Sequence, residues 1–314
     1  MRIAVAGSSG FVGSATWRAL EAAGHDVLPV PLGRITNPAG RGPGAVRAEA
    51  RRLLERHPDR DRLVELLGGA DALVNAAGLA AATSRDEEAL WAANVVLPAV
   101  LAELVARTGV GRFVHVSSAA VQGRRDPLDE STTTAAVSAY ARSKAAGEEV
   151  VLSCGPGAVV YRPTSVQGRD RDITRSLARL GRLRAFPVVD GGRRPVPLAL
   201  IDNVAAAAAF LATRPGVGPV VLHPWEGVTL ADVRRWFAPR ARPVPVPRAV
   251  AAGLSGAGHL LGRWWDPAEA LTRRLDLLLL GQGQDATRLR DAGFVLPVGR
   301  EGWEELVAAV RSPG

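Results

Sequence analysis

The sequence predicts an α/β protein, with a doubly wound parallel sheet and a smaller, interleaved C-terminal part. Three observations predict it. Short apolar runs alternate with helical stretches through the first 163 residues, a glycine-rich turn follows the first run directly, and small or hydroxyl-bearing residues stand where later runs end. This alternation is typical of parallel sheets covered by helices on both faces, whose ligand crevice lies at the carboxyl ends of the strands.

The chain opens with a strand, a glycine turn and a helix. Residues 1–6 are almost wholly apolar, as expected of a strand buried on both faces. A helical stretch follows from Ser14 to Ala23, closed by Gly24. In the turn between them, Gly7 suits the tight bend, Gly10 lets the backbone approach a pyrophosphate, and Gly13 permits close helix packing. This unit predicts a dinucleotide-binding Rossmann opening, with cofactor contacts from Gly7, Ser9, Gly10, Phe11, Val12 and Gly13.

The second strand, residues 26–31, bears on the choice of cofactor. An acidic residue at its end would hydrogen-bond a free ribose 2′-hydroxyl and favour NAD, whereas an arginine would pair with the 2′-phosphate of NADP. No acid stands at the end of this strand, and Arg34 comes shortly after it. NADP is therefore the preferred prediction and NAD the alternative, in which Arg34 is an ordinary solvated loop residue.

Later segments keep the alternation. The predicted elements are a loop at 34–46, helical sequence to about 67, a strand at 71–75, a helix from about 86 to 107, a strand at 112–118, a loop at 130–138, a helix closed by 155–157, and a fifth strand at 158–163. The strand at 71–75 leads into the small-residue turn Ala76-Ala77-Gly78, where a backbone could lie close to a cofactor. Ser117 and Ser118 end the next strand, and His115 inside it is expected to be packed.

Tyr140 and Lys144 carry the strongest chemical signal. Lys144 is the only lysine among 39 basic residues, and Tyr140 is one of two tyrosines. Their four-residue spacing puts both on one face of a helix. A nearby cation lowers the pKa of a phenol towards the pH at which acid–base transfer is effective. The pair therefore predicts catalysis, against the alternative of an ordinary exposed pair on an amphipathic helix.

The alternation weakens after residue 163. A strand at 196–200, a helix at 204–212 and a strand at 219–222 are expected to return to the dinucleotide-binding domain, and 281–293 to form the last helix and turn. Residues 1–163 and 196–223 thus form the predicted dinucleotide-binding domain, and 164–195 with 224–314 a smaller substrate-binding domain. Residues 244–247 and Trp264-Trp265 belong to the smaller domain, where packing in a core or interface is expected of them.

Composition narrows the class of protein. With 314 residues and 47% apolar content, the chain can bury a large core. Cys154 is the lone cysteine and the five histidines show no ligand spacing, so we expect no metal site and a reducing, cytoplasmic location. No apolar run is long enough to span a membrane, and no membrane partner is expected. The net charge of +8 comes from scattered arginines, so nucleic acid is not expected as a partner either.

Several motifs, in this order, resemble the extended short-chain dehydrogenase/reductase family, the NAD-dependent epimerase/dehydratase group. The resemblance covers nearly the whole chain. It rests on Gly7, Gly10 and Gly13, Asn75-Ala76-Ala77-Gly78, Asn94, Ser117 to Gly123, Tyr140 to Lys144, Arg162-Pro163, and Asp202-Asn203-Val204.

The resemblance implies roles for these residues. Tyr140 would be the general acid–base, Lys144 would lower its pKa and hold the nicotinamide ribose, and Ser118 would orient the substrate oxygen. It also implies a homodimer formed through the helices at 86–107 and 139–153. The further cofactor-binding residues would be Ala76, Ala77, Gly78, Asn94, Ser117, Arg162 and Pro163.

Two departures from the family pattern bear on the reaction. Gln122 stands where the family usually has a tyrosine beside the substrate. Ala119 and Ala120 stand where dehydratases of the family carry an Asp-Glu pair, and alanine cannot transfer a proton, so dehydration is disfavoured. The predicted substrate-binding residues are Ser118, Ala119, Gln122, Thr164, Ser165, Gln167, Arg193 and Arg194, with solvated loop positions as the alternative for the two arginines.

These observations predict an NAD(P)-dependent oxidoreductase. It would be a ketoreductase or dehydrogenase acting on a carbonyl/carbinol pair, with a nucleotide-activated sugar as the expected small-molecule substrate. The alternative is an NAD-dependent sugar-nucleotide epimerase, which consumes no net cofactor. A third hypothesis is a non-catalytic NADP-binding sensor, which would have no need of a polarised phenol.

Overall fold

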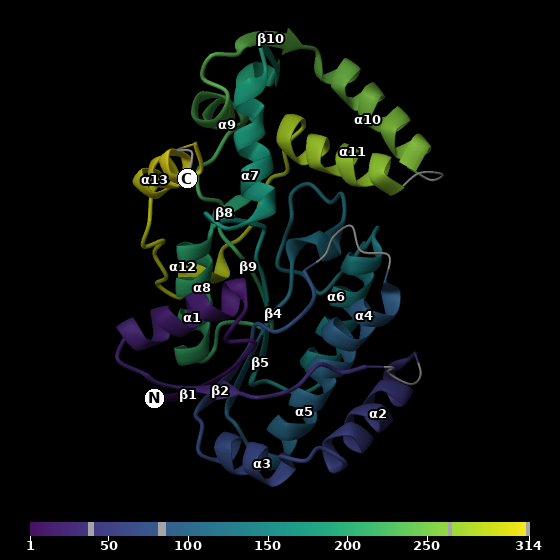
Figure 1. Ribbon diagram of the computed structural model, residues 1–314, viewed down its shortest axis with the longest axis vertical. Helices are drawn as coiled ribbons and strands as arrows, with labels where there is room; N and C mark the ends of the chain where they lie inside the picture. Colours follow the sequence, from purple (N-terminus) through teal and green to yellow (C-terminus); the bar gives the residue numbers. More distant parts are fainter. Residues whose placement is uncertain (37–40, 81–85, 263–265, 312–314) are drawn as a thin grey trace.

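A six-stranded parallel sheet forms the centre of the molecule (Figure 1). The computed structural model describes residues 1–36, 41–80, 86–262 and 266–311. The strand order is β2-β1-β3-β4-β5-β9, and every neighbouring pair is parallel. The predicted doubly wound Rossmann architecture is therefore confirmed.

The strands are β1 (Arg2–Ala6), β2 (Asp26–Val30), β3 (Ala72–Asn75), β4 (Arg112–Val116), β5 (Ala158–Arg162), β6 (Ser165–Gln167), β7 (Ala185–Val189), β8 (Leu198–Leu200), β9 (Val220–Leu222) and β10 (Arg242–Val246). The α-helices are α1 (Phe11–Ala22), α2 (Pro43–Glu55), α3 (Arg60–Gly68), α4 (Glu87–Trp91), α5 (Leu97–Thr108), α6 (Ala139–Leu152), α7 (Asp172–Ala178), α8 (Ile201–Thr213), α9 (Leu230–Phe237), α10 (Arg248–Gly262), α11 (Asp266–Leu279), α12 (Arg288–Asp291) and α13 (Arg300–Arg311). Short helical turns are η1 (Ala92–Val96), η2 (Ala119–Gln122), η3 (Arg179–Arg182) and η4 (Asp190–Gly192).

Each face of the sheet has its own apolar core. On one face, Leu73 and Phe113 pack against side chains of α2, α3 and α5. On the other, Val74 and Val114 pack against α1 and the alanine-rich helix α8. Burial on both faces explains why these strands are almost continuous apolar runs. The same packing fixes α1 and α6 against the sheet.

The strand register brings the predicted site residues to one edge of the sheet. Ala6 pairs with Asn75, Asn75 with His115, and Val116 with Tyr161. The segments that follow β1, β3, β4 and β5 therefore leave the sheet side by side. This edge is where a doubly wound fold places its ligand crevice.

Three helical expectations need correction in the first half of the chain. The expected helix ending near residue 67 is two helices, α2 and α3, separated at Pro58, which has no N–H to donate. The expected loop at 34–46 gives way to α2 at Pro43. The expected helix at 86–107 is interrupted by η1, a π-helical turn before Pro98.

The smaller part lies above the sheet in Figure 1. It contains two short parallel ribbons, β6 with β8 and β7 with β10. β8 therefore lies outside the six-stranded sheet, whereas α8 packs on that sheet and β9 pairs with β5. Helix α13 packs Trp303 flat against Trp236 of α9, with ring centroids 5.8 Å apart.

The expected helix at 281–293 is also wrong, because only α12 is helical there. Gln282 instead donates to the carbonyls of Gly123 and Arg125, and Gln284 forms a β-bridge with Leu128. Trp264 and Trp265 lie outside the described residues.

One helical segment, Glu87–Thr108, is long and apolar enough to cross a membrane by length and composition alone. In the structure, 61% of its apolar window is buried, and it packs on the sheet as a core helix.

Candidate functional site

The turn after β1 leaves no room for side chains at its glycines. Gly7 has a φ of +78°, and a Cβ there would lie 2.5 Å from the Ala77 backbone nitrogen. A Cβ on Gly13 would overlap the Gly7 carbonyl oxygen, because α1 packs directly on the turn. Gly10 begins the helix and donates its N–H to the Gly7 carbonyl at 2.9 Å. The turn therefore presents the N-terminus of α1 at the sheet edge, where it suits an anion.

A hollow of about 370 Å³ lies beside this turn. It is lined by Ser8, Ser9, Ser14, Trp17, Arg18 and Pro29. Arg18 and the predicted Arg34 are both exposed, and neither forms an ion pair with another described residue. A cradle that excludes Cβ atoms, next to a hollow lined by serine hydroxyls, Trp17 and the Arg18 guanidinium, fits a phosphate-bearing dinucleotide.

Tyr140 lies at the start of α6, in hydrogen-bonding contact with Ser118. Ser138 caps this helix by accepting the Ala141 N–H at 3.1 Å. Burial raises the pKa of the Tyr140 phenol, while a hydrogen bond with the Ser118 hydroxyl and the charge of Arg171 act to lower that pKa. The direction is opposite to the sequence-based expectation that Lys144 would lower it. The structure thus favours the protonated phenol.

Lys144 lies one turn further along α6 and is buried. Its Nζ donates to the Val116 carbonyl at 3.0 Å, so the ammonium sits at the end of β4 and is not aimed at the phenol. Burial lowers the pKa of Lys144 from its usual value to about 8, and the charge of Glu148 opposes that shift. A Cβ on Gly78 would lie 2.8 Å from Asn94 Oδ1 and 3.1 Å from this Nζ, so the turn after β3 packs closely against both side chains.

A buried ion pair lies next to Lys144 and acts on it through the charge of Glu148. Glu148, one turn beyond Lys144, pairs with Arg162 at 2.6 Å, and both side chains are at most 2% exposed. Ser117 donates to the same carboxylate at 2.5 Å, and Arg162 also donates to the Ser131 carbonyl at 2.7 Å. The side chains of Ser117 and Arg162 are therefore engaged with Glu148, and any contribution they make to a cofactor site is indirect.

Asn94 fixes the turn that carries Gly78. Its amide accepts the Leu79 N–H at 2.9 Å and donates to the Leu79 carbonyl at 3.2 Å and to Ser143 at 3.0 Å. The π-helical turn η1 places this side chain, since an extra residue per turn rotates Asn94 relative to a regular helix. Asn94 thus joins the Gly78 turn to α6 from inside the protein.

Asn75 and His115 form a second internal brace. The Asn75 amide contacts His115 Nδ1 at 2.9 Å and accepts the Ala77 N–H at 3.0 Å. Burial, with the nearby charge of Lys144, lowers the pKa of His115 well below its usual range. His115 is packed, as expected, and its neutral ring leaves Lys144 as the cation at this point.

Arg171 joins the site without having been predicted from the sequence. It precedes α7, and its guanidinium lies over the Phe11 ring, 4.9 Å from the centroid. Its charge also reaches Tyr140. It therefore lies between the glycine turn and the phenol.

Some of the predicted substrate residues carry hydroxyl groups at the strand ends, and others are packed inside the protein. Ser118 and Thr164 carry hydroxyl groups at the ends of the strands, and the Thr164 hydroxyl is buried without a hydrogen-bond partner among the described residues. Ala119 packs with Leu128 and Leu222. Gln122 is fully buried and binds Asp129 through both its amide nitrogen and oxygen, at 2.6 and 3.0 Å. The Ala119 and Gln122 side chains are therefore structural here, contrary to the expectation of substrate contact.

The other predicted substrate residues lie further along the chain. Gln167 is buried and bonded to Ser165 and Thr174, which ties β6 to α7. Arg194 pairs with Asp126 at 2.7 Å and donates to the Leu280 carbonyl, whereas Arg193 is exposed. Pro163 accepts the Ala119 N–H through its carbonyl. The structure therefore does not gather the two arginines around Tyr140.

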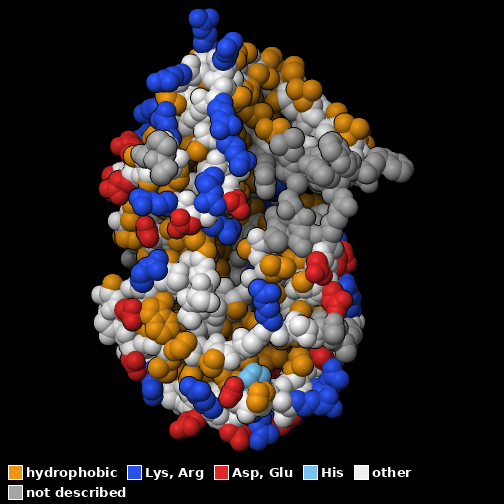
Figure 2. Space-filling model, viewed as in Figure 1, with side chains coloured by type: hydrophobic (Ala, Val, Ile, Leu, Met, Phe, Trp, Pro, Cys, Tyr) orange, Lys and Arg blue, Asp and Glu red, His pale blue; other side chains and the backbone are white. Residues whose placement is uncertain are grey.

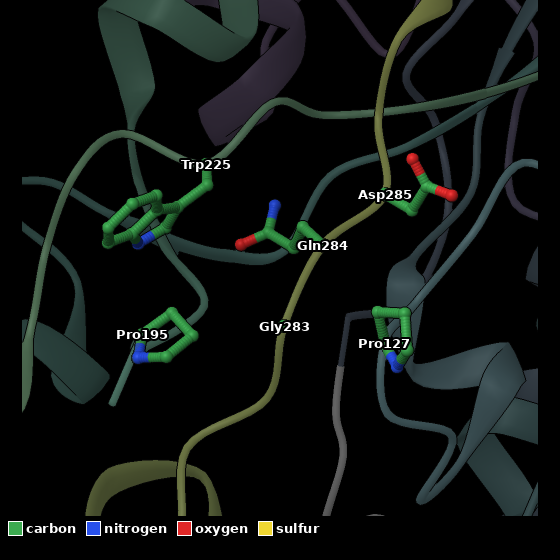
Figure 3. Close-up of a pocket in the computed structure, with 6 residues that line it drawn as sticks. All are labelled: Pro127, Pro195, Trp225, Gly283, Gln284 and Asp285. Carbon is green, nitrogen blue, oxygen red and sulfur yellow. The ribbon is translucent and has the colours of Figure 1, made fainter. Parts of the chain in front are cut away.

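A separate cleft of about 400 Å³ lies near Arg194 (Figure 3). Trp225 and Pro195 stand on one side of it and Pro127 on the other, with Gln284 between them. Gln284 is held by donating to the His223 carbonyl at 2.7 Å. The residues that line this cleft include none that the sequence predicted for the cofactor or the substrate.

Glu148 carried a signal that the sequence analysis overlooked. Tyr140, Lys144 and Glu148 repeat every four residues and form one stripe along α6. Arg171 had no comparable signal, because its approach to Phe11 and Tyr140 depends on how the smaller part packs.

Two curated relatives share close to a third of their aligned residues with this chain. A ceramide reductase of Caulobacter vibrioides is 30% identical over 234 residues, which cover 72% of this chain and 65% of that protein. A dTDP-4-dehydrorhamnose reductase of Mycobacterium tuberculosis is 30% identical over 284 residues, covering 81% of this chain and 84% of that one. The chain thus spans slightly less than two thirds of the first relative and most of the second.

Solved structures show the same fold. The UDP-glucuronic acid 4-epimerase of Bacillus cereus, in complex with NAD, superposes with a TM-score of 0.64 at 16% identity, covering 99% of this chain and 96% of that one. The dTDP-4-dehydrorhamnose reductase of Bacillus anthracis, in complex with NADP, superposes with a TM-score of 0.64 at 17% identity, covering 98% of both chains.

The family model for the NAD dependent epimerase/dehydratase family matches residues 3–221. This match runs from β1 through β9 and includes the glycine turn, Ser118, Tyr140 and Lys144. The chain therefore belongs to the NAD dependent epimerase/dehydratase family.

Proposed function

We propose that this protein is an NADPH-dependent ketoreductase. The observation that carries the proposal is the half-buried Tyr140 at the start of α6, in hydrogen-bonding contact with Ser118 at the end of β4, where burial raises the pKa of the phenol. A protonated phenol is the form that reduction of a carbonyl requires, because it donates the proton. The names of the two relatives, which are both reductases, also support carbonyl reduction as the reaction.

In this proposal the bound nicotinamide supplies a hydride to the carbonyl carbon of the substrate. Ser118 holds the carbonyl oxygen by a hydrogen bond, and Tyr140 gives its phenolic proton to that oxygen as the alcohol forms. Lys144, charged below about pH 8, would hold the nicotinamide ribose from the end of β4. The glycine turn binds the pyrophosphate through backbone N–H groups at the start of α1.

The substrate class proposed is a nucleotide-activated sugar bearing a ketone. Residues 164–195 and 224–314, proposed as the substrate-binding part, hold 20 arginines and 13 acidic residues, which is +7 of the net +8. This excess favours an anionic ligand such as a diphosphate. One of the two relatives is a ceramide reductase, so a long-chain ketone is the second substrate class to be compared with the nucleotide sugars.

The test is NADPH oxidation with a panel of 4-keto nucleotide sugars and long-chain ketones. Tyr140→Phe should lower kcat by about 10²–10⁴-fold with NADPH affinity retained, because only the proton donor is lost. Arg142→Gln, on the exposed side of the same helix, is the matched control. Unchanged turnover in the Tyr140 variant would contradict the proposal.

An epimerase would behave differently in the same experiment. It would interconvert sugar epimers without net oxidation of NADPH and would release tightly held NAD on denaturation. A non-catalytic sensor would bind the cofactor and turn over no substrate, and Tyr140→Phe would leave its biological role intact.

The cytoplasmic location and the homodimer stay predictions. The exposed, unpaired thiol of Cys154 supports a reducing compartment. Sedimentation of the purified protein would test the dimer that the family resemblance implies through α5 and α6.

A further inference from the structure

Helix α10 exposes an apolar stripe to solvent. Val250, Leu254, Ala257 and Leu261 follow a spacing of four, three and four residues, which places them on one face of the helix. Val250, Leu254 and Leu261 are 52%, 69% and 65% exposed. No charged residue occurs from 249 to 262. Figure 2 shows hydrophobic side chains at the upper right of the molecule, where Figure 1 places α10.

The opposite face of α10 is already occupied, so the stripe is not an inner face left uncovered. His259 hydrogen-bonds Asp276 of α11 at 2.6 Å, and Gly258 lies so close to Thr272 that a Cβ there would overlap it. Small residues and this polar contact join α10 to α11. The leucines on the far side therefore serve no packing purpose within the described chain.

Four arginines stand at the same end of the molecule. Arg182 and Arg184 precede β7, and Arg240 and Arg242 lie at the start of β10, which leads directly into α10. All four are exposed, and none forms an ion pair or side-chain hydrogen bond with another residue in the described part of the chain. Val244, 45% exposed on β10, links the arginines to the stripe.

We propose that this end of the molecule, the α10 stripe together with the four arginines, docks on an anionic lipid membrane surface. Apolar side chains on a helix lying in the interface enter the acyl boundary, and neighbouring guanidinium groups attract lipid phosphates. The proposal does not depend on the proposed function. It departs from the expectation of no membrane partner, which considered only spanning segments.

A second copy of the chain fits this surface less well. Two-fold pairing would bring the same patch together from both subunits, so like-charged arginines would face each other. Strand addition along β10 is also blocked, because Pro243 and Pro245 have no N–H to donate. A negatively charged lipid surface attracts the arginines and needs no backbone hydrogen bonds from β10.

The test is co-sedimentation of the full chain with vesicles of phosphatidylcholine containing about 30% phosphatidylglycerol, against phosphatidylcholine alone. We expect binding to the anionic vesicles, weakened by salt, and at least about tenfold weaker partition for Leu254→Asp with Leu261→Asp. Val295→Asp is the matched control, because Val295 is 80% exposed away from the patch. Thermal unfolding of each variant checks that it is folded.

Three results would overturn the proposal. The first is no binding to anionic vesicles, and the second is equal binding by the Leu254/Leu261 double variant. The third is concentration-dependent dimerisation of the wild type that the double variant abolishes, which would make the patch an interface between copies. Loss of binding in Arg182→Ser with Arg184→Ser, with the leucines intact, would support the electrostatic half of the proposal.

Discussion

Glu148 sets the charge state of the site through Lys144. The lysine pKa of about 8 results from burial that Glu148 partly offsets, and Arg162 holds Glu148 in place. The charge of Lys144 therefore depends on a carboxylate that Arg162 and Ser117 hold inside the protein.

Glu148→Gln tests this dependence. Lys144 should lose its proton at lower pH in the variant, so the fall in kcat/KM on the alkaline side should move to lower pH. The variant should also unfold about 3 kcal/mol more easily, because Arg162 loses its buried partner. A pH–rate profile with a urea titration checks both, and Glu149→Gln, exposed on the same helix, is the control. If Glu148→Gln lowers the free energy of unfolding but leaves the alkaline side of the pH–rate profile unchanged, the role of Glu148 is purely structural.

Arg34 tests the choice of cofactor. Arg34→Ala should weaken NADPH binding about tenfold, the loss of one exposed charge-assisted contact, and leave NADH binding unchanged. Fluorescence titration measures both. Arg18→Ala is the informative comparison, since Arg18 lines the hollow beside the glycine turn. If Arg18→Ala alone shows the selective loss, the 2′-phosphate partner is Arg18.

At the scale of elements, the glycine turn is the part that tolerates least change. Gly13→Ala should destabilise the fold by roughly 2 kcal/mol or more and weaken cofactor binding, because its Cβ has no space beside Gly7. Gly44→Ala should be neutral or stabilising, since Gly44 lies in α2 with no atom near a Cβ. Thermal unfolding with and without NADPH compares them. Equal behaviour of the two variants would contradict the crowding argument.

The sequence predicted the sheet well because its strands are buried on both faces and end in recognisable turns. Gly7 and Ser118, which follow β1 and β4, also indicated the edge of the sheet where the site lies, and Tyr140 and Lys144 on α6 lie at that edge. The smaller part was poorly predicted, because its segments have weak periodicity. Residues 281–287 are the clearest case, since Gln282 and Gln284 pair with the loop at 123–128, and no local pattern encodes that contact.

Residue type and spacing singled out Tyr140 and Lys144, and the family resemblance added Ser118. The structure brings Tyr140 and Ser118 into hydrogen-bonding contact, but the contacts that support the site were not predicted. Whether Gln122 or Arg162 faces a ligand or the protein interior depends on Asp129 and Glu148, which approach only after folding. Sequence alone gives no means of deciding between these orientations.

At the scale of the whole molecule, charge is divided unevenly. The two segments 164–195 and 224–314 carry +7, and the rest of the chain carries +1. The end that bears α10 thus lies in the more basic part of the chain and also carries several exposed apolar side chains.

Lys144 makes the stability of the molecule depend on pH. Its pKa is lowered to about 8 in the folded state, so between about pH 8 and 10.5 the unfolded chain binds more protons. The free energy of unfolding should therefore rise with pH across that window, by about 2 kcal/mol from pH 7.5 to 9.5 relative to Lys144→Met. Urea unfolding at both values measures it. A parallel rise in the Lys144→Met variant would assign the effect to other groups.

The π-helical turn at η1 makes the position of Asn94 depend on the length of the chain around it. Pro98 lacks the N–H that would otherwise bond the Asn94 carbonyl, and a Cβ on Gly147 of α6 would overlap that carbonyl. Deleting one residue from 92–96 would restore a regular helix and turn Asn94 by about 100° away from Leu79. A regular helix through 92–96 and the present hydrogen bonds of Asn94 to Leu79 therefore exclude each other, so the irregular turn is the backbone cost of positioning this amide.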